Sequence, residues 1–320
     1  MAGLSAYDSS DCYAAIDLGT NTCLLLIARW DGTRLVPLAQ ELRTIRLGAG
    51  VDKTGQLSQE AISRAALVFK EYQRLIDSYN CHRVRCVATS AFREASNKEV
   101  LHRRIKDTTG YSITELSGRE EAELVLRAVQ HASPSTQGSR AIVDVGGGST
   151  ELILEKDRQL ADSESLPLGS VRLTERWLHH DPPSPEELAA AEHNISDIFT
   201  HSKLAPPVDT IVAVGGTATT LVAMHLGLVT YDHDRVHGAT MTGSTLQKIL
   251  ARCSLLPLEK RLKLPGLQPG RAEVIIAGGL ILQAIIAHFG LETVTVSDQG
   301  LRWGLVLEMV EQERPTAQTS

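Results

Sequence analysis

The sequence lacks any long hydrophobic run and any apolar leader. It contains no uninterrupted apolar stretch of the roughly 18–20 residues that a membrane helix needs. The N-terminus, MAGLSAYDSSDCY, has neither the positive charges nor the apolar segment of a secretory signal peptide. These absences predict a cytoplasmic protein that does not contact a membrane.

Cysteine is scarce, and the five that occur are scattered: Cys12, Cys23, Cys81, Cys86 and Cys253. A structural zinc site needs two closely spaced pairs of ligands, and Cys81 and Cys86 have no such second pair. An odd number of dispersed cysteines is typical of free thiols. The spacing therefore does not predict a zinc site.

Positive charge is in deficit, with 32 Lys+Arg against 38 Asp+Glu and a net charge of −6. A negative net charge argues against a polyanionic ligand. The deficit is uneven, however, since residues 1–120 carry 16 basic and 14 acidic residues, whereas the remaining 200 carry 16 and 24. One basic group turned toward a cleft would suffice to bind a polyanion. No nucleic-acid partner is predicted.

Strand-like and helix-like segments alternate along the chain. The 320 residues suffice for two domains, and a composition of 42% hydrophobic and 22% charged residues is that of a globular protein. Strands are expected at 14–28, 35–45, 84–88, 113–116, 141–145, 151–155, 210–214 and 293–296. Helices are expected between them, one of them capped by Ser58, with a loop after residue 155. This alternation predicts an α/β protein.

One strand–turn–strand phrase occurs twice, about 127 residues apart: AIDLGTNT from Ala15 and IVDVGGGSTE from Ile142. Aligning the copies superposes Asp17 on Asp144. Each copy is a buried strand that ends in an aspartate, followed by a glycine turn. The N–H groups of such a turn can hold a phosphate while the aspartate faces a metal or its water shell. The duplication therefore predicts two similar domains whose turns face each other across a cleft.

Each of these phrases also has a purely structural explanation. A hairpin turn would account for either glycine turn taken alone, but the second turn is followed by Ser149, Thr150 and Glu151, which favour a functional site. The segment Gly215–Thr217 separates a strand from a helix, and the free N–H groups at that helix start would attract an anion. Arg93, at a helix start in TSAFRE, fits a bidentate phosphate clamp or an ordinary surface position.

Two acidic residues, Glu120 and Glu121, open a helix after Ser117. Acidic residues in a first helical turn commonly do no more than complement the helix dipole. The same dipole would favour the ionised carboxylate that a general base needs. Both interpretations stay open on this segment alone.

Two further phrases are less specific. His233, Asp234 and His237 in YDHDRVHG could ligate a metal, but the composition fits an exposed loop equally well. The phrase DQGLRWG, at 298–304, is expected to form a strand-to-helix junction that packs against the cleft.

Together the phrases AAIDLGTNT, TSAFREA, ELSGREEAELV, IVDVGGGSTELI, AVGGTATTL and SDQGLRWG resemble the Ppx/GppA family of exopolyphosphatases and guanosine pentaphosphate phosphohydrolases. The resemblance extends, in order and spacing, over nearly the whole chain. It implies an α/β fold of two actin-like ATPase / sugar kinase type (ribonuclease H-like) domains with an interdomain cleft. Residues 1–125 would form the first domain and 126–300 the second, with a final helix at about 300–320 packed back on the first.

The same resemblance implies an activity, a cofactor and partners. The activity is Mg²⁺-dependent, processive release of terminal orthophosphate, with Mn²⁺ as an alternative metal. The substrate would be inorganic polyphosphate or guanosine penta/tetraphosphate, and the protein would be a homodimer. The long members of the family continue into a C-terminal helical domain, whereas this chain resembles the short form. It also departs from the family at Trp303, where glutamate is frequent.

Site residues follow from the resemblance position by position. The catalytic glutamate of the SGxEE phrase falls on Glu121, which would activate water, and that of GGGSTE falls on Glu151, which would help place metal and water. The metal positions are Asp17, Asp144 and Glu151. The positions expected to hold phosphate are Gly19, Thr20, Asn21, Arg93, Gly146, Gly147, Gly148, Ser149, Gly215, Gly216 and Thr217.

These residues predict direct in-line hydrolysis, with Glu121 as the base and with no Ser or Cys nucleophile. The alternatives are a phosphohydrolase acting on the 5′-phosphate of pppGpp, a nucleotidase acting on ATP or ADP, and a nucleotide or alarmone sensor without activity. A sugar kinase would need a sugar pocket, and the phrase SGREEAELV fits the phosphatase pattern better.

Overall fold

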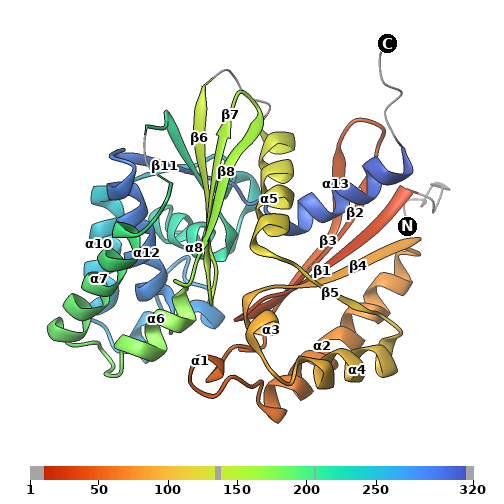
Figure 1. Ribbon diagram of the computed structural model, residues 1–320, viewed down its shortest axis with the longest axis horizontal. Coiled ribbons are helices and arrows are strands. Elements are labelled where there is room, and N and C mark those ends of the chain that lie inside the picture. The colour runs from red at the N-terminus through yellow and green to blue at the C-terminus, as the bar shows by residue number, and fades with distance from the viewer. Residues whose placement is uncertain (1–10, 134–137, 205–206, 315–320) are drawn as a thin grey trace.

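The computed structural model describes residues 11–133, 138–204 and 207–314, which form two halves that are each built on one mixed β-sheet (Figure 1). The first sheet has the order β3-β2-β1-β4-β5. Its strands are β1 (Cys12–Leu18), β2 (Thr22–Trp30), β3 (Leu35–Thr44), β4 (Arg83–Ala88) and β5 (Ile113–Glu115). The second sheet has the order β10-β11-β9-β6-β7-β8. Its strands are β6 (Ser139–Val145), β7 (Thr150–Lys156), β8 (Gln159–Leu166), β9 (Thr210–Val214), β10 (Thr240–Thr242) and β11 (Thr293–Val296).

Both halves repeat one strand arrangement. In the first sheet, β1 pairs antiparallel with β2 and parallel with β4, and β3 extends the antiparallel side. In the second sheet, β6 pairs in the same way with β7 and β9, and β8 extends the antiparallel side. The repeated phrase of the sequence is therefore the central hairpin of each sheet. This duplicated order confirms the expected class of two actin-like ATPase / sugar kinase type domains.

The helices cover the sheets, and several of them begin at a residue whose side chain caps the helix. They are α1 (Val51–Thr54), α2 (Gln59–Ser78), α3 (Ser90–Glu94), α4 (Lys98–Thr109), α5 (Gly118–Ala132), α6 (Ser170–Trp177), α7 (Pro185–Thr200), α8 (Gly215–His225), α9 (His233–Val236), α10 (Gly243–Ser254), α11 (Leu258–Arg261), α12 (Ile275–His288) and α13 (Leu301–Glu313), with a 3₁₀ turn at Pro269–Arg271. Ser58 caps α2 as expected, because its hydroxyl accepts a hydrogen bond from the N–H of Ala61. Ser117 and Glu120 form a capping box at α5.

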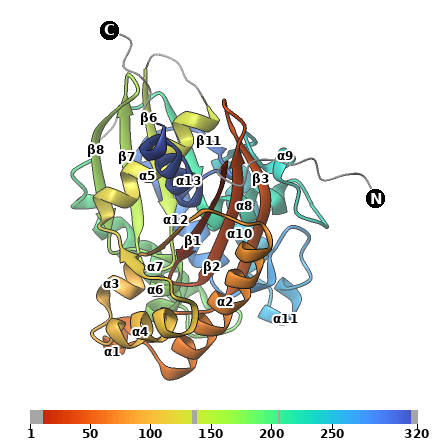
Figure 2. The same ribbon diagram turned by 90° about the vertical axis from the view of Figure 1, so that its right-hand side faces the viewer.

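Helices α5 and α13 fill the space between the two sheets (Figures 1 and 2). Their buried residues share one apolar core with the inner faces of both sheets, including Ala15 on β1 and Ile142 on β6. Helix α13 crosses back from the second half and packs on β1 and β2. The expected division at residues 125 and 126 falls within α5, and that domain boundary stays a prediction. The first turns of α5 and α13 lie in the region where the central hairpins of the two sheets meet.

Several elements differ from the sequence-based expectation. The segment 159–166 is the strand β8, whose sequence QLADSESL shows little apolar alternation because it lies at a sheet edge and buries only Leu166. The segment around Ser90 and Arg93, expected to be the start of a helix, forms a separate short helix, α3, which ends at Glu94 before α4 begins. Helix α12 is strongly apolar but only 14 residues long, and none of the helices in the described residues could span a membrane.

Candidate functional site

The two glycine turns have the same backbone geometry. The N–H of Gly19 donates to the carbonyl of Thr22 over 2.9 Å, and the N–H of Gly146 donates to that of Ser149 over 3.0 Å. Both are therefore the closing turns of equivalent hairpins. The N–H groups at the tips of the turns, at 20–21 and 147–148, donate to no other described residue. They are the groups that an anion between the turns would engage.

The turns approach each other closely at Gly147 and Thr20. A Cβ added at Gly147 would lie 2.8 Å from the Cβ of Thr20, so only glycine fits there. Between them lies a cavity of about 90 Å³. Residues 19–22 and 144–149 line it, together with Thr89, Ser90, Glu121, Gly215 and Gly216. The structure thus brings the predicted catalytic glutamate and both phosphate turns to one small cavity.

Glu121 lies in the first turn of α5 and is 6% exposed. Its Oε2 atom is buried and has no hydrogen-bond partner among the residues that the structure describes. Burial, reinforced by Glu151, Asp144 and Asp17, raises the pKa of Glu121 well above its usual value, against the opposing charge of Arg93. A carboxylate in this position can accept a proton near neutral pH.

Glu151 lies on β7 directly opposite Asp144 of β6 and is 1% exposed. The hydroxyl of Ser165 donates to its Oε1 atom over 2.9 Å. Burial and the negative charge of Asp144 raise the pKa of Glu151 to about 7, while hydrogen bonds from Ser149 and Ser165 oppose the rise. Glu151 is thus oriented by two hydroxyls and electrostatically coupled to its acidic neighbours.

Asp17 and Asp144 end the equivalent strands β1 and β6. Burial raises the pKa of Asp17 to about 7, with Arg302 opposing the shift and Asp144 adding to it. Burial raises the pKa of Asp144 to about 6, against the charge of Arg271. The Oδ1 atom of Asp17 has no hydrogen-bond partner in the described part of the chain. Two half-buried carboxylates that repel each other in this way favour the binding of a cation.

Helix α8 begins at Gly215, three residues earlier than expected, so its N-terminus lies at the site. Gly215 has a φ of +78°, and a Cβ added there would collide with the Asp144 carboxylate. Glycine is therefore required by both conformation and space.

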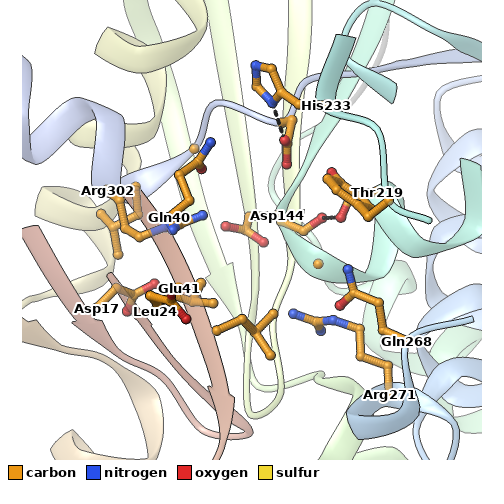
Figure 3. Close-up of a pocket in the computed structure, with 17 residues that line it drawn as sticks. Asp17, Leu24, Gln40, Glu41, Asp144, Thr219, His233, Gln268, Arg271 and Arg302 are labelled. Carbon is orange, nitrogen blue, oxygen red and sulfur yellow. Dashed lines mark hydrogen bonds and ion pairs between the residues drawn. The ribbon is translucent and has the colours of Figure 1, made fainter. Parts of the chain in front are cut away.

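A larger chamber of about 300 Å³ adjoins the small cavity and shares seven lining residues with it, among them Asp17, Asp144, Gly215, Gly216 and Arg271. Figure 3 shows Asp17 and Arg302 on one side of Asp144 and Arg271 and Gln268 on the other. The chamber is lined by Leu24, Gln40, Glu41, Leu42, Thr219, Tyr231, His233, Gln268, Asp298, Gly300, Leu301 and Arg302 as well. It combines cationic and acidic groups with amides and apolar side chains, and of its two arginines Arg271 is buried and Arg302 half-buried.

The cationic groups of the chamber come from distant segments. Burial lowers the pKa of Arg271 to about 10, with Asp144 opposing the shift. Arg302 donates from Nη1 to the carbonyl of Leu25 over 2.8 Å, and its charge opposes the rise in the pKa of Asp17. Neither arginine was identified from the sequence. The only sequence feature that marks Arg271 is its position just ahead of the apolar run of α12. Arg302 belongs to the phrase that was expected to pack against the cleft, and that segment does line the chamber.

The histidine-containing phrase YDHDRVHG is neither an exposed loop throughout nor a metal site. His233 hydrogen-bonds through Nδ1 to Asp298, and this bond raises the pKa of His233. The ring also stacks on the indole of Trp303. His237 accepts a hydrogen bond from the N–H of Asp298. Within the described residues, no group of three or more His, Cys, Asp or Glu side chains could hold a metal ion.

Some predicted phosphate ligands are engaged elsewhere. Arg93 donates from Nη1 to the carbonyl of Leu116 over 2.6 Å and lines neither cavity. The hydroxyl of Thr217 donates to the carbonyl of Val145 over 2.9 Å. The amide of Asn21 lines the small cavity but donates to the carbonyl of Gly270 in the other half. Phosphate binding by Arg93 and Thr217 stays a prediction, and in this structure their polar atoms serve to hold backbone.

Arg172 of α6 fastens the second turn to the first half. Its Nε atom donates to the carbonyl of Gly148 over 2.8 Å. Its Nη2 atom donates to both carboxylate oxygens of Glu94 over 2.7 Å, and Nη1 pairs with Asp52. Arg176, one helical turn on, also pairs with Asp52. These ion pairs join α6 to α1 and α3 directly beneath the phosphate turns.

Comparison with known proteins places these features in a family. The Ppx/GppA phosphatase family matches the chain over residues 26–313. Exopolyphosphatase 2 of Mycobacterium tuberculosis is 34% identical over 312 residues, which cover 92% of this chain and 98% of that protein. The crystal structure of the Aquifex aeolicus Ppx/GppA family member aligns with a TM-score of 0.80 and 34% identity, covering 95% of this chain and 98% of that one. An exopolyphosphatase structure from Cytophaga hutchinsonii aligns with a TM-score of 0.86 and 25% identity, covering 94% and 98%.

Proposed function

The chain belongs to the Ppx/GppA phosphatase family, and from this premise we propose that it is an exopolyphosphatase, which hydrolyses terminal orthophosphate from inorganic polyphosphate. One observation carries the proposal. The buried, unpartnered oxygen of Glu121 and the tips of both glycine turns belong to one cavity of about 90 Å³. This arrangement places a base beside an anion site in a cavity whose size suits a single phosphoryl group.

The terminal phosphoryl group binds in the small cavity, where the free N–H groups of the two turns surround it. The rest of the polyphosphate chain leaves through the adjoining chamber, past Arg271 and Arg302. Thr89, Ser90 and Glu121 line the small cavity but not the chamber, so a chain that extends into the chamber would present its end to Glu121. Such a site favours attack at the terminal phosphorus.

Asp17, Asp144 and Glu151 are the residues that we propose would hold a divalent cation, with Mg²⁺ preferred and Mn²⁺ as an alternative. The fit rests on the donor set: Glu151 is buried and both aspartates are half-buried, the pKa values of all three are raised, and Asp17 retains an unpartnered oxygen. Mg²⁺ typically takes one or two carboxylates and completes its shell with water and phosphate oxygens, so a preformed cluster of three ligands is not required. When bound, the cation would neutralise charge on the phosphate oxygens.

Glu121 acts as the general base. It takes a proton from a water molecule as the water oxygen attacks the terminal phosphorus, and the bond from that phosphorus to the bridging oxygen breaks. The products are orthophosphate and a chain shortened by one phosphate. Glu151, held by Ser165, orients the water, and the charge of Arg93 stabilises the ionised form of Glu121. The turns stabilise the charge of the transferring group.

A guanosine pentaphosphate 5′-phosphohydrolase is the second candidate function. The lining of the chamber favours it, since Leu24 and Leu42 offer apolar contact and Gln40 and Gln268 offer amides that could pair with the edge of a base. Both substrates would present the same terminal phosphoanhydride to Glu121. The chamber, rather than the small cavity, would decide between them.

The experiment compares phosphate release by the purified chain from long-chain polyphosphate and from pppGpp in parallel, with Mg²⁺ present. Release mainly from polyphosphate supports the first proposal, and release mainly from pppGpp supports the second. Substitution Gln268→Ala, in the chamber only, should reduce a preference for pppGpp while leaving release from polyphosphate nearly unchanged. No release from either substrate would contradict both proposals.

A further inference from the structure

Two of the five cysteines lie side by side at the end of the first sheet that is remote from the site. Cys12 opens β1, and Cys81 lies just ahead of β4, the parallel neighbour of β1 (Figure 1). Their Sγ atoms are 3.1 Å apart. The backbone already fixes this proximity, because the N–H of His82 donates to the carbonyl of Cys12 over 3.1 Å and Tyr13 is in register with Arg83.

The geometry is close to that of a disulfide. A disulfide bond is about 2.05 Å long, so the two sulfurs need to approach by roughly 1 Å. Adjacent strands lie about 4.8 Å apart, and bridged cysteines usually have Cα atoms about 4.4–6.8 Å apart. The bond can therefore form by small side-chain rotations without moving the strands.

The two sulfurs also differ in the way that thiol chemistry requires. A hydrogen bond from Cys81 lowers the pKa of Cys12, and the charge of Arg29 adds to this effect against burial. The same hydrogen bond raises the pKa of Cys81. Within the pair, Cys12 is therefore the more easily ionised thiol; it is buried, whereas Cys81 is partly exposed. The other three cysteines are buried, and burial raises the pKa of each thiol.

We propose that Cys12 and Cys81 are a redox pair that forms a reversible intrachain disulfide on exposure to a peroxide. The Cys12 sulfur attacks one peroxide oxygen, the O–O bond breaks, and the released hydroxide takes the proton of Cys81. The Cys81 sulfur then attacks the sulfur of the resulting sulfenic acid and displaces hydroxide, which becomes water by taking up the proton that Cys12 lost on ionisation. In total, two thiols and one hydrogen peroxide give one disulfide and two waters, and a dithiol reductant reverses the change.

The bridge would enclose β2, β3, α1 and α2, which lie between Cys12 and Cys81 in the sequence. Linking the ends of a long loop restricts the unfolded chain, so the oxidised protein should melt at a higher temperature. Asp17 lies at the other end of β1, so the rate of phosphate release should stay the same. The proposal is therefore independent of the proposed function.

The test oxidises the reduced, full-length chain with a small molar excess of hydrogen peroxide and counts thiols after denaturation. Five thiols should react before treatment and three after it, and peptide mapping should find Cys12 joined to Cys81. Reduction should restore all five and return the melting temperature to its initial value. The partly exposed Cys81→Ser variant should lose no pair of thiols, whereas the matched control Cys253→Ser should lose two like the wild type.

Persistence of all five thiols under these conditions would overturn the proposal. So would a bridge that maps to Cys23, Cys86 or Cys253, or a Cys81→Ser variant that still loses two thiols to a disulfide. Oxidation of Cys12 to a sulfinic acid without any cross-link would also overturn the proposal, because Cys81 would then have failed to react with it.

Discussion

Replacement of Arg172 by glutamine should loosen the second phosphate turn and weaken the closure of the cleft. The side chain is 12% exposed, and its three nitrogens each hold a different partner: the carbonyl of Gly148, the carboxylate of Glu94 and that of Asp52. A hydrogen bond from a charged donor contributes about 1.5–3 kcal/mol. The pair with Glu94 is discounted, because that carboxylate is 39% exposed and solvent screens it.

The bond to Gly148, which is the one that holds the phosphate turn, then suggests a loss of about 2 kcal/mol, which corresponds to roughly a 30-fold fall in kcat/KM. The assay is steady-state phosphate release over a range of polyphosphate concentrations, with melting temperatures measured alongside. Arg172→Lys should recover only part of the loss, since an ammonium cannot reproduce the forked contacts of a guanidinium.

Arg176→Gln is the matched control. Arg176 is 45% exposed and pairs with Asp52, but it does not contact the phosphate turn, so its loss should reduce kcat/KM much less. The reasoning would be refuted if Arg172→Gln kept kcat/KM within about twofold of wild type while folded. It would also be refuted if Arg176→Gln caused an equal fall, since the carbonyl of Gly148 would then be irrelevant.

Two further predictions concern the carboxylates of the site. Because the folded-state pKa values of Asp17 and Glu151 are raised to about 7, their ionisation destabilises the folded, metal-free protein as pH rises above their ordinary values near 4; below those values the penalty is absent. Mg²⁺ should therefore raise the melting temperature more at pH 8 than at pH 5, and an equal shift at both pH values would contradict the proposed ligands. Gly215→Ala should abolish most phosphate release, because at a φ of +78° the new methyl group collides with Asp144. The control is Gly227→Ala, since Gly227 also has a positive φ, +63°, but no neighbour within 4 Å of the added methyl group. Equal activity of the two variants would count against the argument that crowding at Asp144 requires glycine.

The centre of the site was predictable because its chemistry lies in contiguous phrases. Asp17 and Asp144 each end a buried strand, and the glycine turn that follows is encoded by the next few residues. Their repetition predicted two similar halves and a cleft, which the duplicated strand order confirms. Glu121 could not be distinguished from a simple helix-dipole residue by its own segment, and only the resemblance assigned it a role.

The rest of the site was hidden because it depends on segments that meet only after folding. Arg271 precedes α12 in the sequence. His233 lies in α9 and lines the chamber, where it hydrogen-bonds to Asp298. Nothing in the spacing of these residues indicates their proximity. Conversely, Arg93 and Thr217 match the family pattern, but their polar atoms bind backbone carbonyls, which no local pattern reveals. Strand β8 was missed for a related reason, since an edge strand needs few apolar residues.

The most direct test of the account is the turnover of Glu121→Gln. This substitution keeps the shape of the side chain but removes its ability to accept a proton, so we predict a fall in kcat of about 10²–10⁴-fold. Binding of polyphosphate, measured separately by equilibrium methods, should persist because the turns and the arginines remain. A variant that is folded and binds substrate but retains near-wild-type kcat would show that Glu121 is not the base and would contradict the account.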